Sequence, residues 1–339
     1  MAGAQDIHYS LADFMPTWLN PALAGAYEGT ARVGGIYRDQ SRGFFDQAYQ
    51  TPGFYVDAPI LTLGKKQKAW LGVGGLLISD RVGVAALGTT YIEGGASVHF
   101  VVDETRSSRR VVSVGLRGGV LQRSADLSGE DIILAEEQEV AVGGGGLGVG
   151  MGLERGGAGG MLNSSGIDIG FGVSLAEQLD EDRNFRVGVS GRHLTQPDYM
   201  LSTRGEAKRD LTIGAQAQYR QLLDDKYVIE PALFAQYTAS QLELQVQGMV
   251  GGYLGAESDK LVKVGLGIRA PLNYVYPMVG FEYKDLRLAA AFDIATNGLQ
   301  QAADGDTDFF PTGFEIAAQY IIKIYKQPKV EPVILCPQI

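Results

Sequence analysis

The sequence of 339 residues has one cysteine, Cys336, and three histidines, at positions 8, 99 and 193. An intrachain disulfide and a cysteine-based metal site are therefore excluded. No histidine has an i,i+4 partner of the kind that binds zinc. No G-x-S-x-G motif occurs, and Ser190 and His193, three residues apart, are expected on opposite faces of a strand. We therefore predict that the protein is not an enzyme and has no cofactor.

Long hydrophobic runs and an excess of basic residues are also missing. No run reaches the roughly 18 apolar residues of a membrane-spanning helix. The mean hydropathy of -0.01 is still compatible with a membrane β-barrel, because every second residue of such a barrel faces its interior. Lys and Arg total 29 against 39 Asp and Glu, for a net charge of -10. Nucleic acid is therefore not an expected partner, since it requires a basic patch.

Glycine, tyrosine and phenylalanine are abundant, with 47, 16 and 13 residues, and much of the chain alternates with a period of two. In 211–220, Leu, Ile, Ala, Ala and Tyr alternate with Thr, Gly, Gln, Gln and Arg. This spacing is typical of a strand with one apolar and one polar face. About fourteen segments have the roughly 9–11 residues that cross a bilayer: 30–40, 52–60, 68–79, 88–102, 109–122, 166–176, 184–195, 209–221, 226–239, 241–252, 260–270, 273–285, 286–296 and 313–323.

The connections between these segments sort by length. Those longer than about ten residues, such as 123–165 and 297–312, all follow odd-numbered segments. Bacterial outer-membrane barrels have an even strand number, short periplasmic turns and long external loops. The sequence therefore predicts an all-β fold: an antiparallel transmembrane β-barrel of about 14 strands over 30–325, in the outer membrane of a Gram-negative bacterium, with both termini periplasmic. Polar residues on the second face are predicted to line the interior: Gln216, Gln218, Arg220, Arg287 and Asp293.

The residues before the first strand have a different pattern. Ala2-Gly3-Ala4 has the A-x-A form of a signal-peptidase site, so residues 1–4 are interpreted as the remnant of an export signal. Pro16 and Pro21 prevent regular strand pairing, Pro21 restricts Asn20 to extended conformations, and Gly25 permits a tight turn. Residues 5–29 are therefore predicted to form an ordered strap or plug at or in the periplasmic mouth, and 326–339 a C-terminal tail.

One acidic stretch resembles a calcium-binding loop. Asp304, Asp306, Asp308 and Glu315 occupy positions 1, 3, 5 and 12 of such a loop, but Phe309 stands at position 6, which requires glycine for a sharp turn. The alternative is a solvated acidic loop between the last two strands. No metal is therefore predicted, and these four residues remain the calcium candidate.

The start of the chain resembles the PorP/SprF family of outer-membrane proteins. That family typically has an N-terminal Gln-Asp, an aromatic-containing stretch, an N-P-A-x-A-G step, and a Y-R-x-Q step on the first strand. "FYVDAPI" (54–60) and "GVGGLLISDRVG" (72–83) extend the resemblance, whereas Ser41 replaces a frequent Trp and the prolines of "KQPKVEPVILCPQI" (326–339) depart from a strand-terminal aromatic. Candidate motif residues are Gln5, Asp6, Tyr9, Pro16, Trp18, Leu19, Asn20, Pro21, Ala22, Ala24, Gly25, Tyr37, Arg38 and Gln40.

This resemblance implies a component of the type IX secretion system. Such a protein binds or anchors a secreted cell-surface protein of the adhesin or gliding-motility type through that protein's C-terminal domain, or contacts periplasmic secretion components. The connections 123–165 and 297–312 would offer surfaces to a partner. An alternative is a passive or hydrophobic-solute channel with the first 29 residues as its plug, and a soluble β-sandwich adhesin is a third hypothesis.

Overall fold

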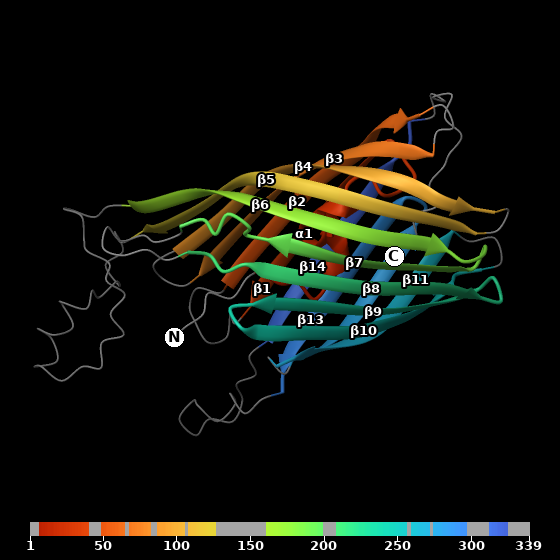
Figure 1. Cartoon of the computed structure of the whole chain (residues 1–339). Helices are drawn as coiled ribbons and strands as arrows, with labels where there is room; N and C mark the ends of the chain where they lie inside the picture. The colour runs from red at the N-terminus through yellow and green to blue at the C-terminus, as the bar shows by residue number, and fades with distance from the viewer. Residues whose placement is uncertain are drawn as a thin grey trace, which may run out of the picture.

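The computed structural model describes residues 7–40, 49–64, 68–82, 87–105, 108–126, 161–198, 208–255, 259–271, 274–296 and 312–324. Fourteen antiparallel strands form a closed barrel in which each strand pairs with its sequence neighbours and β1 pairs with β14 (Figure 1). The prediction of a 14-stranded barrel is therefore confirmed. The strands are β1 (Ala31–Gln40), β2 (Tyr49–Leu63), β3 (Ala69–Val82), β4 (Leu87–Glu104), β5 (Arg109–Asp126), β6 (Met161–Gln178), β7 (Arg183–Arg192), β8 (Thr212–Leu223), β9 (Tyr227–Thr238), β10 (Gln241–Tyr253), β11 (Lys260–Ala270), β12 (Tyr274–Tyr283), β13 (Leu286–Ala295) and β14 (Thr312–Ile322).

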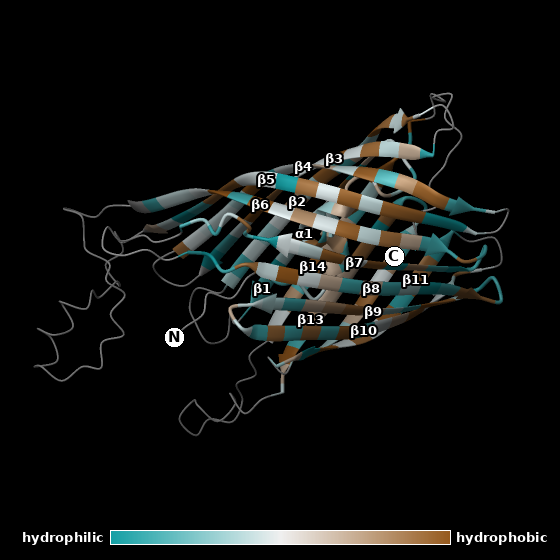
Figure 2. Ribbon diagram, viewed as in Figure 1, coloured by the Kyte–Doolittle hydropathy of each residue, from teal (hydrophilic) through white to brown (hydrophobic). Residues whose placement is uncertain are grey.

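The period-two pattern of the sequence orients the side chains. In β9, Val228, Glu230 and Phe234 are buried in the barrel, while the alternate residues Tyr227 and Leu233 face outward. Apolar and polar residues consequently alternate along the ribbons in Figure 2. Within the described ranges, no helix has the length and apolar character needed to cross a membrane.

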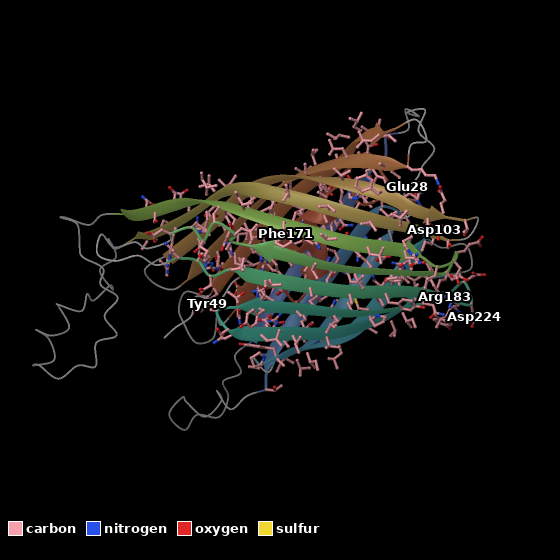
Figure 3. The ribbon with its side chains drawn as sticks, viewed as in Figure 1. Glu28, Tyr49, Asp103, Phe171, Arg183 and Asp224 are labelled. Atoms are coloured by element: carbon pink, nitrogen blue, oxygen red, sulfur yellow. The ribbon has the colours of Figure 1, made fainter. Side chains whose placement is uncertain are left out.

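The two rims of the barrel differ in the connections that they carry. At one rim, the short-connection rim, the longest connection is 254–259, with six residues between β10 and β11. The opposite, long-connection rim carries 127–160, 193–211 and 296–311. Figure 3 places the charged residues Asp103, Arg183 and Asp224 together at the short-connection rim.

The strands are also unequal in length. β4, β5 and β6 have 18 residues each, whereas β1, β7, β12 and β13 have 10. β5 and β6 consequently extend beyond β8–β10 toward the left in Figure 1. The predicted connection 123–165 is shorter in the structure, because both strands continue as β pairs up to Asp126 and Met161. The sequence pattern missed these residues because their outward positions are polar.

The residues before β1 lie inside the barrel. The N-terminal segment (residues 7–30) contains two 3₁₀ turns, η1 (Ala12–Phe14) and η2 (Pro21–Leu23), and a helical turn, α1 (Pro16–Leu19). Both prolines stand at the first positions of such turns, where a missing N–H costs nothing. The sequence predicts a segment at or in one mouth, and the structure shows one that extends further through the lumen.

The path of this segment follows from its contacts at the two ends. Ser10 bonds to Glu315, which lies near the long-connection end of β14, while the Thr30 N–H donates to the Ile322 carbonyl at the opposite end of that strand. Between them, the segment contributes apolar side chains to a core shared with the strands. Its members include Tyr9, Leu11, Phe14, Met15 and Trp18 from the segment, and Ile36, Tyr55, Ile78, Tyr91, Leu121, Tyr276 and Met278 from the wall.

Candidate functional site: the lumen and its N-terminal segment

Asn20 fixes the N-P-A-x-A-G step of the segment to the barrel wall. Its Nδ2 donates to the main-chain carbonyls of Val173 on β6 and Val189 on β7, both at 3.1 Å. Its Oδ1 accepts from the Ala22 N–H at 2.9 Å and so caps η2. Asn20 is fully buried, and these bonds satisfy donors and acceptors that would otherwise cost free energy.

Inward-facing glycines of the strands make room for this step. A Cβ on Gly172 of β6 would lie 1.9 Å from Asn20 Oδ1, and one on Gly115 of β5 would lie 2.5 Å from the Pro21 main chain. A Cβ on Gly72 of β3 would lie 2.2 Å from the carbonyl oxygen of Ala24. These distances are far below van der Waals contact, so the segment and the wall are matched in shape.

Asp57 holds the end of the same step. Its Oδ2 accepts from the Gly25 N–H at 2.6 Å, and both its oxygens bind the Arg32 guanidinium at 2.8 and 2.9 Å. Gly25 has a φ of 66°, a left-handed conformation that favours glycine. Arg32 also donates to the Leu23 carbonyl and lies 4.5 Å from the centre of the Tyr27 ring. The "DAPI" stretch and the N-P-A-x-A-G stretch, distant in sequence, therefore meet here.

A buried histidine recognises the carbonyl of Ala24. His99 Nε2 lies 2.8 Å from this oxygen, and Ser97 Oγ donates to it at 2.5 Å. Since a carbonyl only accepts, Nε2 carries the proton and Nδ1 accepts from Ser113 Oγ at 2.7 Å. The Trp70 ring stacks on His99 with centroids 4.5 Å apart and donates to the Gly25 carbonyl at 3.0 Å. The ring is thus fixed by Ala24, Ser113 and Trp70.

Trp18 occupies the middle of the lumen between two cations. The guanidinium carbons of Arg117 and Arg192 lie 4.9 and 4.5 Å from its ring centre, and Tyr91 meets it edge-on at 5.0 Å. Arg117 also donates to the Thr17 and Trp18 carbonyls at 2.9 and 3.0 Å, and forms an ion pair with Glu93 at 3.0 Å. We call Thr17–Tyr27 the trailing half of the segment.

The leading half, Ile7–Asp13, has different contacts. Glu315 accepts from two successive N–H groups, those of Ser10 and Leu11, both at 2.8 Å. Gln245 donates to the Ser10 carbonyl at 2.8 Å, and Arg38 donates to the His8 carbonyl. Side chains of the strands therefore form hydrogen bonds with the main chain of this half.

Charged residues around Ser10 form one connected cluster. Ser10 Oγ donates to Asp293 at 2.5 Å and accepts from Arg269 at 2.6 Å. Arg38 binds Asp293 at 3.0 Å and Glu315 at 3.4 Å. Isolated buried charges are costly, but here each ion has a partner of opposite sign.

A second charged cluster lies toward the short-connection rim. Lys263 binds Glu230 and Glu282, both at 2.7 Å, and Arg287 binds Glu282 and Asp13 of the segment, both at 3.0 Å. Arg220 completes the cluster with a 2.8 Å contact to Glu230. The inner face of β8–β14 therefore carries two charged clusters, with apolar residues such as Tyr276 and Met278 also on this face.

The structure places the predicted interior residues as follows. Gln216 and Gln218 are buried inside β8, Arg220 and Arg287 belong to the second cluster, and Asp293 belongs to the cluster around Ser10. Among the motif residues, Gln40 donates to the Tyr274 hydroxyl at 3.3 Å, and Tyr37 packs against Phe314 with ring centroids 6.0 Å apart. Leu19 accepts from Ser190 Oγ through its carbonyl at 2.9 Å.

Two expectations are corrected or limited by these positions. Glu315, the last residue of the calcium candidate, lies in β14 within the predicted strand 313–323, where its carboxylate binds the segment. Asp304, Asp306 and Asp308 lie outside the described residues, as do Gln5 and Asp6.

The spacing of Ser190 and His193 predicts that they lie on opposite faces of a strand, but in the structure they do not. Both are buried, because His193 adopts a φ of 59° just beyond β7 and this left-handed step breaks the alternation. They nevertheless contact different groups, since His193 Nδ1 lies 2.7 Å from Asp168 while Ser190 donates to Leu19.

The outer surface of the long strands changes character near the long-connection rim. Paired outward residues Leu77, Ile92, Val120 and Ile167 are 45–68% exposed. The next outward residues on the same strands are polar: Ser79, Thr90, Gln122 and Ser165. On β9, by contrast, the outer face is apolar between Tyr227 and Tyr237, as expected for a lipid-facing band bounded by aromatic residues.

Comparison with known families identifies this type of barrel. The family model described as "Type IX secretion system membrane protein PorP/SprF" matches residues 2–310. The chain belongs to the PorP/SprF family. This PorP/SprF member is therefore an outer-membrane β-barrel of a secretion-system family, and no curated protein matches its sequence.

Several solved structures are similar in fold to this PorP/SprF barrel. The Ralstonia pickettii toluene transporter TbuX has 10% identity and a TM-score of 0.48, over 91% of this chain and 94% of that chain. The monoaromatic hydrocarbon channel CymD has 12% identity and a TM-score of 0.48, over 96% of both chains. The P. putida toluene transporter TodX has 12% identity and a TM-score of 0.47, over 91% of this chain and 93% of that chain. At such identities the similarity concerns the barrel fold alone.

The sequence did not single out several residues that hold the segment, among them Arg32, Glu93, His99, Arg117 and Arg269. Each is a charged or polar residue at an inward position of a strand. A polar residue at a position that alternation places on the inner face is the sequence signal that could have identified them. Their pairing partners could not be found in this way, because they are contributed by the segment or by other strands.

Proposed function

We propose that this PorP/SprF barrel binds a secreted cell-surface protein at its long-connection rim and holds it at the outer membrane. The observation that carries the proposal is the polar outer surface of the long strands beyond their apolar band. Gln122 on β5 and Ser165 on β6 are paired neighbours, one outward step beyond Val120 and Ile167. A polar extension past the lipid-facing band offers a surface outside the bilayer for a protein partner.

The filled lumen supports a binding role over solute passage. The segment contacts the inner wall through Asn20 on one side and Ser10 on the other. Cavities remain between it and the wall, but one that is lined by Tyr9, Trp18, Arg192 and Gln245 has a volume of only about 50 Å³. That volume accommodates a few water molecules.

Site-specific photo-crosslinking in cells would test the proposal. A photoreactive amino acid would replace Ser165 beyond the apolar band, Ile169 within it, or Glu181 at the short-connection rim. We expect Ser165 to cross-link to a secreted surface protein and Ile169 to give lipid adducts alone. Cross-links to periplasmic secretion components from Glu181, without any from Ser165, would instead support a linking role and overturn the anchoring role.

The channel hypothesis has a separate test. Purified barrel in planar bilayers is expected to show no steady conductance, because the segment fills the lumen. A constant pore in the full-length protein would favour transport. Deletion of the segment provides the positive control for an opened barrel.

A further inference from the structure

We propose that the lumen contains a peptide-binding site, that His8–Leu11 occupies it as an exchangeable intramolecular ligand, and that a second peptide with the same turn can take its place. The site is formed by Arg38, Gln245, Arg269, Asp293 and Glu315, which come from five different strands. This inference does not rest on the proposed function, because a partner could be held at the rim even if the lumen bound no second peptide.

The recognition is directed at the main chain. Glu315 accepts from the Ser10 and Leu11 N–H groups, and Gln245 and Arg38 donate to the carbonyls of Ser10 and His8. Main-chain hydrogen bonds provide affinity with little dependence on sequence, as in peptide recognition by sheet edges. Two successive N–H groups reach one carboxylate because the chain turns at Ser10 and Leu11. A peptide that reaches the site and makes the same turn can therefore form the same bonds.

One side chain supplies selectivity. Ser10 Oγ lies between Asp293, which accepts its proton at 2.5 Å, and Arg269, which donates to it at 2.6 Å. A hydroxyl both donates and accepts, so serine and threonine satisfy both partners. The ligand class is therefore a peptide that turns at this position and carries a hydroxyl residue there.

The position of the site makes exchange feasible. Arg38, Asp293 and Glu315 lie within two or three residues of the long-connection ends of β1, β13 and β14. The cavity of about 50 Å³ lies beside Ile7, His8 and Tyr9, between them and β7–β10. Trp18 and Leu19 of the trailing half also line this cavity, but the Asn20–Gly25 stretch is in addition interlocked with glycine-lined strands.

A truncated barrel would test the site directly. The variant lacks residues 1–12, and the probe is a fluorescein-labelled peptide of residues 5–12, QDIHYSLA. Binding is measured by fluorescence anisotropy in detergent, after heat-modifiable gel mobility has shown that the variant is folded. We expect the truncated barrel to bind the peptide at least tenfold more tightly than the full-length protein does, because the intramolecular ligand competes in the latter.

Two changes test main-chain recognition. N-methylation of the peptide at Leu11 removes one donor to Glu315, and Glu315→Gln in the truncated barrel weakens the acceptor. Each is expected to lower the affinity at least tenfold. Glu177→Gln, on the outer face of β6 and paired with Arg110, is the matched control and should leave the affinity unchanged. Absence of binding to the folded truncated barrel, or equal binding after both changes, would overturn the proposal.

Hydrogen exchange in the full-length protein keeps the proposal testable if the truncated barrel does not fold. The amides of Ser10 and Leu11 should exchange at least tenfold faster than those of Ala22 and Gly25. The reverse order would show that the leading half is the less exchangeable part of the segment and would remove the basis of the inference.

Discussion

The two halves of the N-terminal segment are held in one lumen by different interactions. The leading half is bound mainly through its main chain, by charged and polar side chains of β1, β10, β11, β13 and β14. The trailing half also has main-chain hydrogen bonds to the wall, for example from Arg117 and to Asp57, but it is in addition interlocked by shape, since Asn20–Gly25 fill spaces left by glycines on β3, β5 and β6. Polar bonds can be exchanged for bonds to another peptide or to water, whereas an interlocked shape requires the wall to move. The comparison indicates one replaceable part and one structural part.

The largest expected effect concerns the ion pair between Arg32 of β1 and Asp57 of β2, which holds the end of the trailing half. Arg32→Met leaves the Asp57 carboxylate buried without its cation, which costs about 3–5 kcal/mol. Of the two tryptophans of the chain, Trp18 lies in the trailing half and Trp70 donates to its Gly25 carbonyl. Urea unfolding in detergent can therefore be followed by their fluorescence.

The matched control for that substitution is Arg183→Met, which removes an exposed pair with Asp180 and should leave the unfolding midpoint nearly unchanged. Arg32→Met combined with Asp57→Asn should recover part of the loss. Equal stability of the two single variants would show that the Arg32 pair contributes no more than a surface contact.

A smaller effect tests the shape match. Gly172→Ala would place a Cβ 1.9 Å from Asn20 Oδ1 and should destabilise the barrel by about 1–3 kcal/mol, because the trailing half must shift. Gly248→Ala on β10 is the control, since a Cβ there meets no heavy atom within 4 Å. If both variants unfold at the same urea concentration, the segment is not interlocked with β6.

In the leading half, the expected effect is local and concerns the exchange of two amides. Glu315→Gln weakens two charge-assisted hydrogen bonds, each worth about 1.5–3 kcal/mol, so the Ser10 and Leu11 amides should exchange about tenfold faster or more. The Ala22 amide, held by Asn20, serves as the internal reference. Accelerated exchange at Ala22 as well would mean that the two halves open together.

The sequence predicted the barrel, its strand number and the unusual start of the chain, because period-two alternation and proline positions are local signals. It did not predict how far β5 and β6 extend, since their last outward residues, such as Ser165, have no apolar pattern. It also placed His193 on the wrong face, and it did not reveal that Glu315, within the predicted strand 313–323, binds the segment. A partner across the lumen, or a left-handed residue, leaves no periodic signal in the sequence.

The lumen contacts of the segment also constrain how the barrel is assembled. Tyr27 is four residues from Ala31, the first residue of β1, and the seam that closes the barrel joins β1 to the last strand, β14. The trailing half contacts β2–β7, which precede β14 in the chain. A segment that docks on these strands before the seam forms is enclosed without threading, and its contact with Asp57 holds β1 in position to meet β14. Docking in that order would make the segment an internal template for barrel closure, retained after assembly as part of the finished protein.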